Sequence, residues 1–166
     1  MDFFNDTATT EKEAGFIEKV ITKQDVMLDL CCGTARHAIL LAKKGWEIVG
    51  ADLSKSLLQI ARNKMRKEGI DFPLVRCEMR FLPFRNEVFS AVFSMFTSFG
   101  YLPSEEDDLG CLREIVRTLK PKGNFLLDVI NRDYLLRVFK ESDVADFGTF
   151  IMEEKRSLDE NKTRIS

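Results

Sequence analysis

The 166-residue sequence lacks several features that would each assign a protein to a class. No apolar run approaches the roughly 20 residues that span a bilayer, and the first residues have neither the basic start nor the apolar core of a signal peptide. The net charge is only -2, which gives no general attraction to nucleic acid or to acidic membranes. Four cysteines form no C-x-x-C pair, and the single histidine, His37, does not complete a usual zinc ligand set. These absences predict a reduced, cytoplasmic protein that has no metal site, no membrane partner and no nucleic-acid partner.

The composition is that of a folded chain, with 45% hydrophobic and 31% charged residues. Apolar segments typical of strands alternate with amphipathic segments typical of helices, which predicts right-handed βαβ units and a mostly parallel, doubly wound α/β sheet. Thr10 and Glu13 resemble a capping box, and Ser54, Ser104 and Asn131 are further candidate N-caps. The predicted helices cover 10–22, 35–44, 54–68, 104–119 and 131–139, and the predicted strands cover 26–30, 46–51, 72–76, 88–93 and 124–130.

The last residues follow a different pattern. Residues 148–156 alternate weakly, 159–162 are typical of a turn, and 163–166 begin what we expect to be a return strand. We therefore predict one domain over 1–166, with a cofactor-binding core over 10–140 and the start of an antiparallel extension over 141–166.

Two strand ends in the first third of the chain carry the candidate ligand site. The turn at 31–35 follows the first predicted strand, and ligands of doubly wound sheets lie beyond the carboxyl ends of the strands. Asp52 ends the second strand, where a carboxylate can accept hydrogen bonds from both hydroxyls of a ribose. A tight turn without a ligand, and an aspartate that merely begins a helix beside Ser54, are the plainer alternatives.

A third element follows the third predicted strand. Glu78 can accept a hydrogen bond from an adenine amino group, and the backbone N–H of Met79 can meet a ring nitrogen. An exposed glutamate is more often simply solvated, so this feature gains weight only together with Asp52.

In combination these segments resemble the class I S-adenosylmethionine-dependent methyltransferases, in particular their bacterial and archaeal small-molecule branch. The resemblance rests on residues 28–37, 50–54, 77–80 and 89–101, and it continues through 112–123 and 125–131. Within these segments Cys31 and Ala35 stand where the family often has glycine, and Glu78 stands where aspartate is commoner. Ser90 replaces a frequent aspartate.

The resemblance implies S-adenosylmethionine as cofactor, S-adenosylhomocysteine as product, and methyl transfer to a small-molecule acceptor. It identifies no catalytic group, because the departing thioether is neutral and needs no acid. It also implies that the chain is truncated at its C-terminus, which would leave an open sheet edge for a second copy to cover as a homodimer. The cofactor-binding residues that it implies are Asp29, Cys31, Cys32, Gly33, Asp52, Leu53, Glu78, Met79, Arg80, Ser94 and Met95.

Residues 93–101 are the expected acceptor wall, in which Phe93 and Phe96 have core packing as an equal alternative and Ser98 and Tyr101 are candidate pocket polar groups. His37 is expected to act through packing rather than as a base, and Arg36 as an ion-pair former or a carboxylate ligand. Two other functions remain open. One is a binding module that holds S-adenosylmethionine without transferring the methyl group. The other is a nicotinamide-dependent oxidoreductase, although the fingerprint G-x-G-x-x-G is missing.

Overall fold

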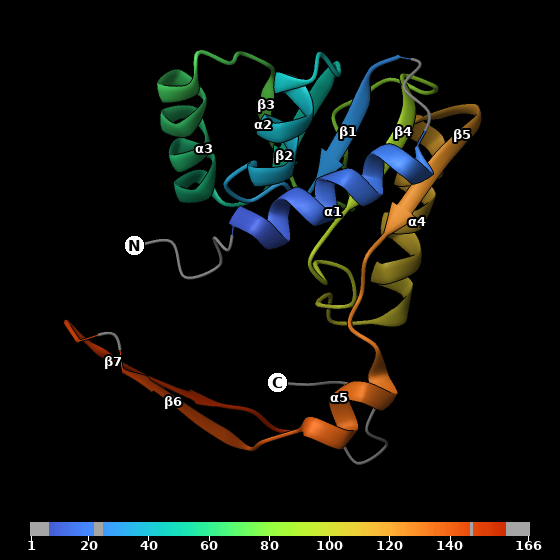
Figure 1. The fold of residues 1–166 in the computed structure, drawn as a ribbon. Helices are drawn as coiled ribbons and strands as arrows, with labels where there is room; N and C mark the ends of the chain where they lie inside the picture. Colours follow the sequence, from blue (N-terminus) through green and yellow to red (C-terminus); the bar gives the residue numbers. More distant parts are fainter. Residues whose placement is uncertain (1–6, 22–24, 147, 159–166) are drawn as a thin grey trace. The chain divides into compact units, whose positions relative to one another are not determined.

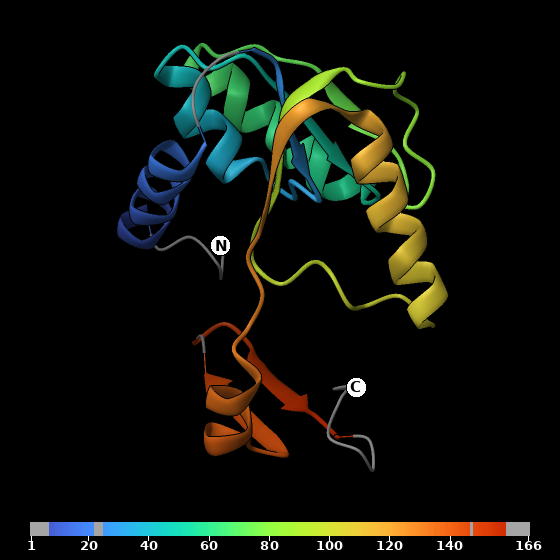
Figure 2. The same ribbon diagram turned by 90° about the vertical axis from the view of Figure 1, so that its right-hand side faces the viewer.

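A computed structural model describes residues 7–21, 25–146 and 148–158 of the chain (Figures 1 and 2). The chain divides into two compact units, Met1–Val129 and Ile130–Ser166. This division precedes the boundary at residue 140 that the sequence pattern predicts. Each unit is described by itself below.

The first unit is built on one parallel sheet of five strands with the order β3-β2-β1-β4-β5. In the centre of this sheet Met27 pairs with Ile48 on one side and with Ala91 on the other. Strand order therefore reverses between β1 and β4, as the predicted doubly wound fold requires. The strands are β1 (Met27–Leu30), β2 (Ile48–Asp52), β3 (Leu74–Arg76), β4 (Phe89–Ser94) and β5 (Leu119–Leu127).

Four helices connect or precede these strands: α1 (Thr7–Val20), α2 (Arg36–Lys43), α3 (Lys55–Glu68) and α4 (Glu105–Thr118). Ser54 and Ser104 cap α3 and α4 as predicted. The Ser54 side chain accepts a hydrogen bond from the Leu57 N–H, and the Ser104 side chain accepts one from the Asp107 N–H. The predicted cap at Thr10 is wrong. Thr10 is buried inside α1, and its hydroxyl accepts a hydrogen bond from Arg36.

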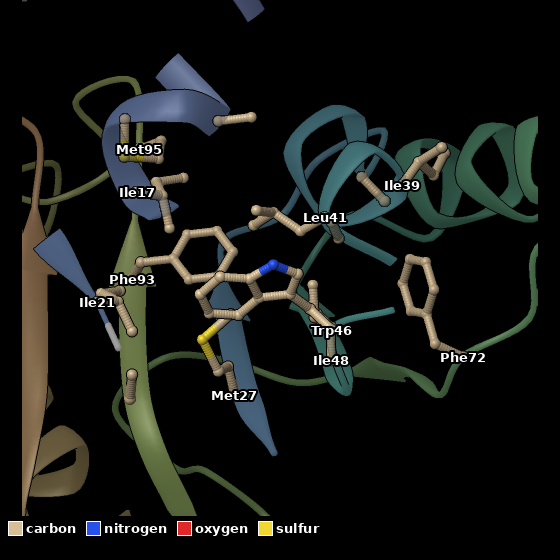
Figure 3. Packing of buried hydrophobic residues seen from close by; sticks show 14 of the residues in the cluster. Ile17, Ile21, Met27, Ile39, Leu41, Trp46, Ile48, Phe72, Phe93 and Met95 are labelled. Carbon is tan, nitrogen blue, oxygen red and sulfur yellow. The ribbon is translucent and has the colours of Figure 1, made fainter. Parts of the chain in front are cut away.

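Apolar side chains cover both faces of the sheet. Figure 3 shows one cluster, in which Phe93 of β4 and Met27 of β1 meet Ile17 of α1 and Trp46. The other cluster joins Leu28, Leu30 and Val92 to Cys111 and Ile115 of α4. The helices α1, α2 and α3 thus pack on one face of the sheet, and α4 packs on the opposite face.

Not every apolar side chain of α4 is buried. Ile115 is buried, but Leu109 and Val116 are 46% and 70% exposed. Cys111 and Thr118 are buried instead, and the Thr118 hydroxyl donates a hydrogen bond to the carbonyl of Ile115. Cys111, Ile115 and Thr118 are spaced four and three positions apart, so they lie on one face of the helix.

Strand β5 also differs from its prediction over 124–130. It begins at Leu119, directly after α4, and its pairing with β4 shifts register between Phe89 and Ala91. Gly123 lies at this irregularity. A Cβ at this position would come within 2.9 Å of the Lys120 carbonyl oxygen and 3.1 Å of the Ser90 carbonyl oxygen. At Gly123, β5 therefore lies so close to the backbone of β4 that a side chain at this position would collide with it.

The second unit consists of α5 (Arg132–Val138) and an antiparallel hairpin of β6 (Ser142–Asp146) and β7 (Ile151–Lys155). Asn131 caps α5 as predicted, by accepting a hydrogen bond from the Tyr134 N–H. In the hairpin Ser142 pairs with Lys155, so the segment predicted over 148–156 pairs with the residues before it. The predicted turn at 159–162 and return strand at 163–166 lie outside the described residues.

No helix in the described part of the chain is both long enough and apolar enough to cross a membrane.

Candidate functional site

The turn after β1 has an alternating backbone conformation. Cys31, Gly33 and Ala35 all have positive φ, at 61°, 56° and 58°. Only glycine adopts this region without strain, so Cys31 and Ala35 hold a conformation that normally selects glycine. The turn thus keeps the backbone path of a glycine-rich loop with a single glycine.

Asp52, at the end of β2, fixes this turn. Its Oδ2 accepts a hydrogen bond of 2.8 Å from the Gly33 N–H, and its Oδ1 accepts one of 2.8 Å from the Ser54 N–H. One carboxylate therefore joins the turn after β1 to the start of α3. Because a carboxylate oxygen can accept two hydrogen bonds, each oxygen of Asp52 retains accepting capacity.

A cavity of about 160 Å³ lies beside Asp52, where the ends of β1, β2 and β3 meet. It is lined by six of the predicted site residues: Cys31, Asp52, Leu53, Glu78, Met79 and Arg80. Sequence reasoning missed four other lining residues: Leu30, Ala51, Cys77 and Leu102. The first three lie at or next to strand ends, so the strand-end rule points to them. Leu102 comes from the loop before α4, and no local signal marks it.

Glu78 forms an ion pair with Arg80 at the wall of this cavity. Its Oε1 accepts a hydrogen bond of 2.7 Å from Arg80 Nε, and its Oε2 accepts one of 2.9 Å from Arg80 Nη2. The Arg80 hydrogen bonds lower the pKa of Glu78, so the carboxylate is ionised at neutral pH. Glu78 is therefore an acceptor of hydrogen bonds and not a donor.

Asp29, Cys32 and Gly33 do not line the cavity. Asp29 is 2% exposed, and its Oδ2 has no hydrogen-bond partner among the described residues. Burial, reinforced by the nearby Asp52 carboxylate, raises the pKa of Asp29 well above its ordinary value. The Cys32 side chain packs near Gly50 instead, where a Cβ on the glycine would lie 3.1 Å from Cys32 Sγ.

The remaining two predicted site residues end β4. Ser94 and Met95 are both buried, and Met95 packs in the cluster that contains Ile17 (Figure 3). The Ser94 carbonyl accepts a hydrogen bond of 2.9 Å from the Asp128 N–H. Neither residue lines the cavity beside Asp52.

The loop after β4 is held by Asp128. Its carboxylate accepts a hydrogen bond of 2.9 Å from the Phe96 N–H, and its carbonyl accepts one of 3.0 Å from the Thr97 N–H. Both loop residues have positive φ, which these two hydrogen bonds compensate. Of the expected acceptor wall, Phe93 is fully buried core, whereas Phe96 and Tyr101 are 55% and 77% exposed.

His37 and Arg36 bind α1. His37 Nε2 lies 2.7 Å from Glu13 Oε2, and Arg36 Nη2 lies 3.3 Å from the same oxygen. The Arg36 guanidinium also lies 4.8 Å from the centre of the Phe96 ring. Burial lowers the pKa of His37 despite its acidic partner, so the neutral ring is favoured. These contacts agree with the expected packing role of His37 and the ion-pair role of Arg36.

Two thiols line the cavity, those of Cys31 and Cys77. Burial raises the pKa of Cys31 to about 12 and that of Cys77 to about 11, so both are protonated near neutral pH. Within the described ranges, no cluster of three or more histidine, cysteine or acidic side chains has the arrangement of a metal site. The lining of the cavity thus combines the acidic residues Asp52 and Glu78 with Arg80, two protonated thiols and apolar side chains.

Comparison with known proteins agrees with this geometry. A family described as "Methyltransferase domain" matches residues 27–123, which is more than half of the chain. YqeM of Bacillus subtilis, whose name places it among the methyltransferases, is 33% identical over 131 residues, covering 79% of this chain and 53% of its own. The demethylmenaquinone methyltransferase of Bacillus velezensis is 37% identical over 101 residues, covering 58% of this chain and 41% of its own.

The fold is also that of solved structures. A structure described as an S-adenosylmethionine-dependent methyltransferase from Clostridium acetobutylicum superposes with a TM-score of 0.76. It shares 22% sequence identity, and the match covers 92% of this chain and 61% of that one. The chain thus spans about half the length of the relatives that it matches in sequence.

Proposed function

Because this chain belongs to the class I S-adenosylmethionine-dependent methyltransferases, we propose that it binds S-adenosylmethionine at the ends of β1, β2 and β3 and transfers the methyl group to a small-molecule acceptor. The observation that carries the proposal is the Asp52 carboxylate, which joins the turn at Gly33 to the wall of the adjoining cavity. The small-molecule acceptor is supported by relatives such as the demethylmenaquinone methyltransferase.

The residues of the site fit this cofactor. Asp52 retains accepting capacity for the two ribose hydroxyls, and ionised Glu78 can accept from an amino group of a purine. Apolar side chains of Leu53 and Leu102 line the same cavity and suit the faces of a planar ring.

S-adenosylmethionine supplies a methyl group on a positively charged sulfur, which leaves as a neutral thioether. The contribution of this chain is then to hold the two reactants in line, because effective molarity rises steeply when the reacting atoms are positioned. Asp52 and the turn at 31–35 fix the nucleoside, and the loop after β4, held by Asp128, borders the acceptor side. A base is needed only for an acceptor that must lose a proton.

Isothermal titration calorimetry with S-adenosylmethionine, S-adenosylhomocysteine and NAD tests the binding step. We expect binding of the first two ligands and no binding of NAD. Transfer of a tritiated methyl group to a panel of quinol, amine and carboxylate acceptors tests the reaction. Binding of S-adenosylmethionine with no transfer to any acceptor of the panel would favour a binding module, and binding of NAD alone would favour an oxidoreductase.

A further inference from the structure

Arg80 makes a two-pronged contact with Glu78 at the wall of the cavity. Two different guanidinium nitrogens of Arg80 reach the two oxygens of Glu78, at 2.7 and 2.9 Å. The Arg80 backbone N–H adds a third hydrogen bond to Glu78 Oε1, at 3.2 Å. A fork of this kind fixes the plane of the carboxylate as well as its position.

The third guanidinium nitrogen reaches α4. Arg80 Nη1 donates a hydrogen bond of 2.5 Å to Asp107 Oδ1. Asp107 is itself fixed, because its Oδ2 accepts a hydrogen bond of 2.7 Å from the Ser104 hydroxyl at the N-cap of α4. A continuous chain of hydrogen bonds therefore runs from Glu78 at the cavity through Arg80 and Asp107 to the start of a helix.

This chain of contacts leaves Glu78 free to act on a ligand. Oε1 already accepts two of these hydrogen bonds, whereas Oε2 accepts one and keeps a second accepting direction, and the Glu78 side chain remains 25% exposed. The same contacts lower the pKa of Glu78, so that it carries no proton to donate. Glu78 would thus bind a hydrogen-bond donor of a ligand and disfavour a ligand that presents an acceptor at the same position.

We propose that Arg80 is a positioning residue that makes the site selective for a 6-amino purine, because it holds Glu78 in one orientation as a fixed acceptor. This inference rests on the proposed function, since it concerns how the adenine of the cofactor is recognised. The sequence pattern places Arg80 among the residues that contact the cofactor directly. The geometry instead assigns its guanidinium to Glu78 and Asp107, so its effect on the ligand passes through Glu78.

The discrimination to be measured is between S-adenosylhomocysteine and its hypoxanthine analogue, S-inosylhomocysteine. The two differ at the purine edge, where an amino donor is replaced by a carbonyl acceptor. Calorimetric dissociation constants for both ligands are compared in the wild-type protein and in the variants Arg80→Gln, Arg80→Lys and Asp107→Asn. Arg113→Gln is the matched control, because Arg113 pairs with Glu106 on the exposed surface of α4, at 2.7 Å, and does not line the cavity.

We expect the wild-type protein to bind the adenine ligand at least about 30-fold more tightly, the scale of a hydrogen bond to a charged group. Arg80→Gln should reduce this ratio to below about fivefold, chiefly by weakening the adenine ligand. Arg80→Lys, which keeps the charge but loses the fork, should give an intermediate ratio, as should Asp107→Asn. Arg113→Gln should keep the wild-type ratio.

A merely structural role of Arg80 would weaken both ligands by the same factor and leave the ratio unchanged, which would overturn the inference. So would a wild-type ratio near one. Failure of the wild-type protein to bind S-adenosylhomocysteine would refute the proposed function and the inference together. Binding with unchanged ratios in every variant would refute the inference alone. Circular dichroism of each variant confirms that the compared proteins are folded.

Discussion

Removal of the Asp52 carboxylate should act on the protein twice, and the two effects can be measured separately. In Asp52→Ala the N–H groups of Gly33 and Ser54 lose an acceptor that each meets at 2.8 Å. The turn after β1 and the first turn of α3 would then lose the carboxylate that joins them. The same substitution also removes the proposed acceptor of the ribose hydroxyls.

The magnitude follows from these contacts. A hydrogen bond to a charged group contributes about 1.5–3 kcal/mol, and the half-buried position of Asp52 places each of these at the low end of the range. Solvent can replace part of what is lost, so we expect the free energy of unfolding to fall by about 2–3 kcal/mol. The affinity for S-adenosylhomocysteine should fall by at least about 1.5 kcal/mol, or roughly tenfold in Kd.

Urea unfolding followed by circular dichroism measures the first effect, and calorimetry at 15 °C, where both proteins are verified as folded, measures the second. Asp71→Ala is the control for the loss of one negative charge, because Asp71 is exposed and does not line the cavity beside Asp52. An unchanged Kd in Asp52→Ala would show that Asp52 does not hold the ribose. An unchanged urea midpoint would show that its two hydrogen bonds do not stabilise the turn.

Three further perturbations probe the fold and the site. Gly123→Ala should destabilise the protein by about 1–3 kcal/mol, because the new methyl group would collide with backbone carbonyl groups. The control is Gly110→Ala in α4, where a Cβ meets nothing within 4 Å, and it should stabilise the protein by up to about 1 kcal/mol. Equal urea midpoints for the two variants would contradict the close approach at β5. Because burial lowers the pKa of His37, the unfolded chain binds more protons, so stability should rise as pH increases through about 6.5, and His37→Gln should flatten that rise; an identical pH profile in the variant would refute the assignment. The raised pKa values of Cys31 and Cys77 predict that they react with a disulfide reagent at pH 7.5 at least about tenfold more slowly than free cysteine, and a rate equal to that of free cysteine would exclude protonated, buried thiols.

The sheet and the helix caps could be predicted from the sequence because their signals are local. A short apolar run predicts a buried strand, and Ser54 or Ser104 before an amphipathic segment predicts the start of a helix. The hairpin partner of β7 could not be predicted. The exposed residues of β6 carry no alternating pattern, and strand pairing is a tertiary property.

In the candidate site, too, the residues with a local sequence signal could be predicted and those that depend on tertiary contacts could not. Asp52 and Glu78 follow predicted strands, so the rule for strand ends finds them. Leu102 comes from the loop before α4 and Asp107 from α4 itself, and only the folded chain brings them close to the site. The motif predicts Met95 as a cofactor residue, and the structure places its side chain in the core. Position along a motif does not determine which way a side chain faces.

The turn with left-handed residues at Cys31, Gly33 and Ala35 has a consequence for chain entropy. A glycine in place of Ala35 would relieve backbone strain of about 1–2 kcal/mol in the folded state. It would also raise the conformational entropy of the unfolded chain, which lowers the stability of the fold by about 0.4–1 kcal/mol. It would also remove a methyl group that is fully buried. The relief of strain and these two losses nearly cancel in the free energy of folding, which explains why the turn tolerates side chains at positions 31 and 35. The side chains at 31 and 35 restrict the conformations of the unfolded chain, so the turn loses less conformational entropy when it forms.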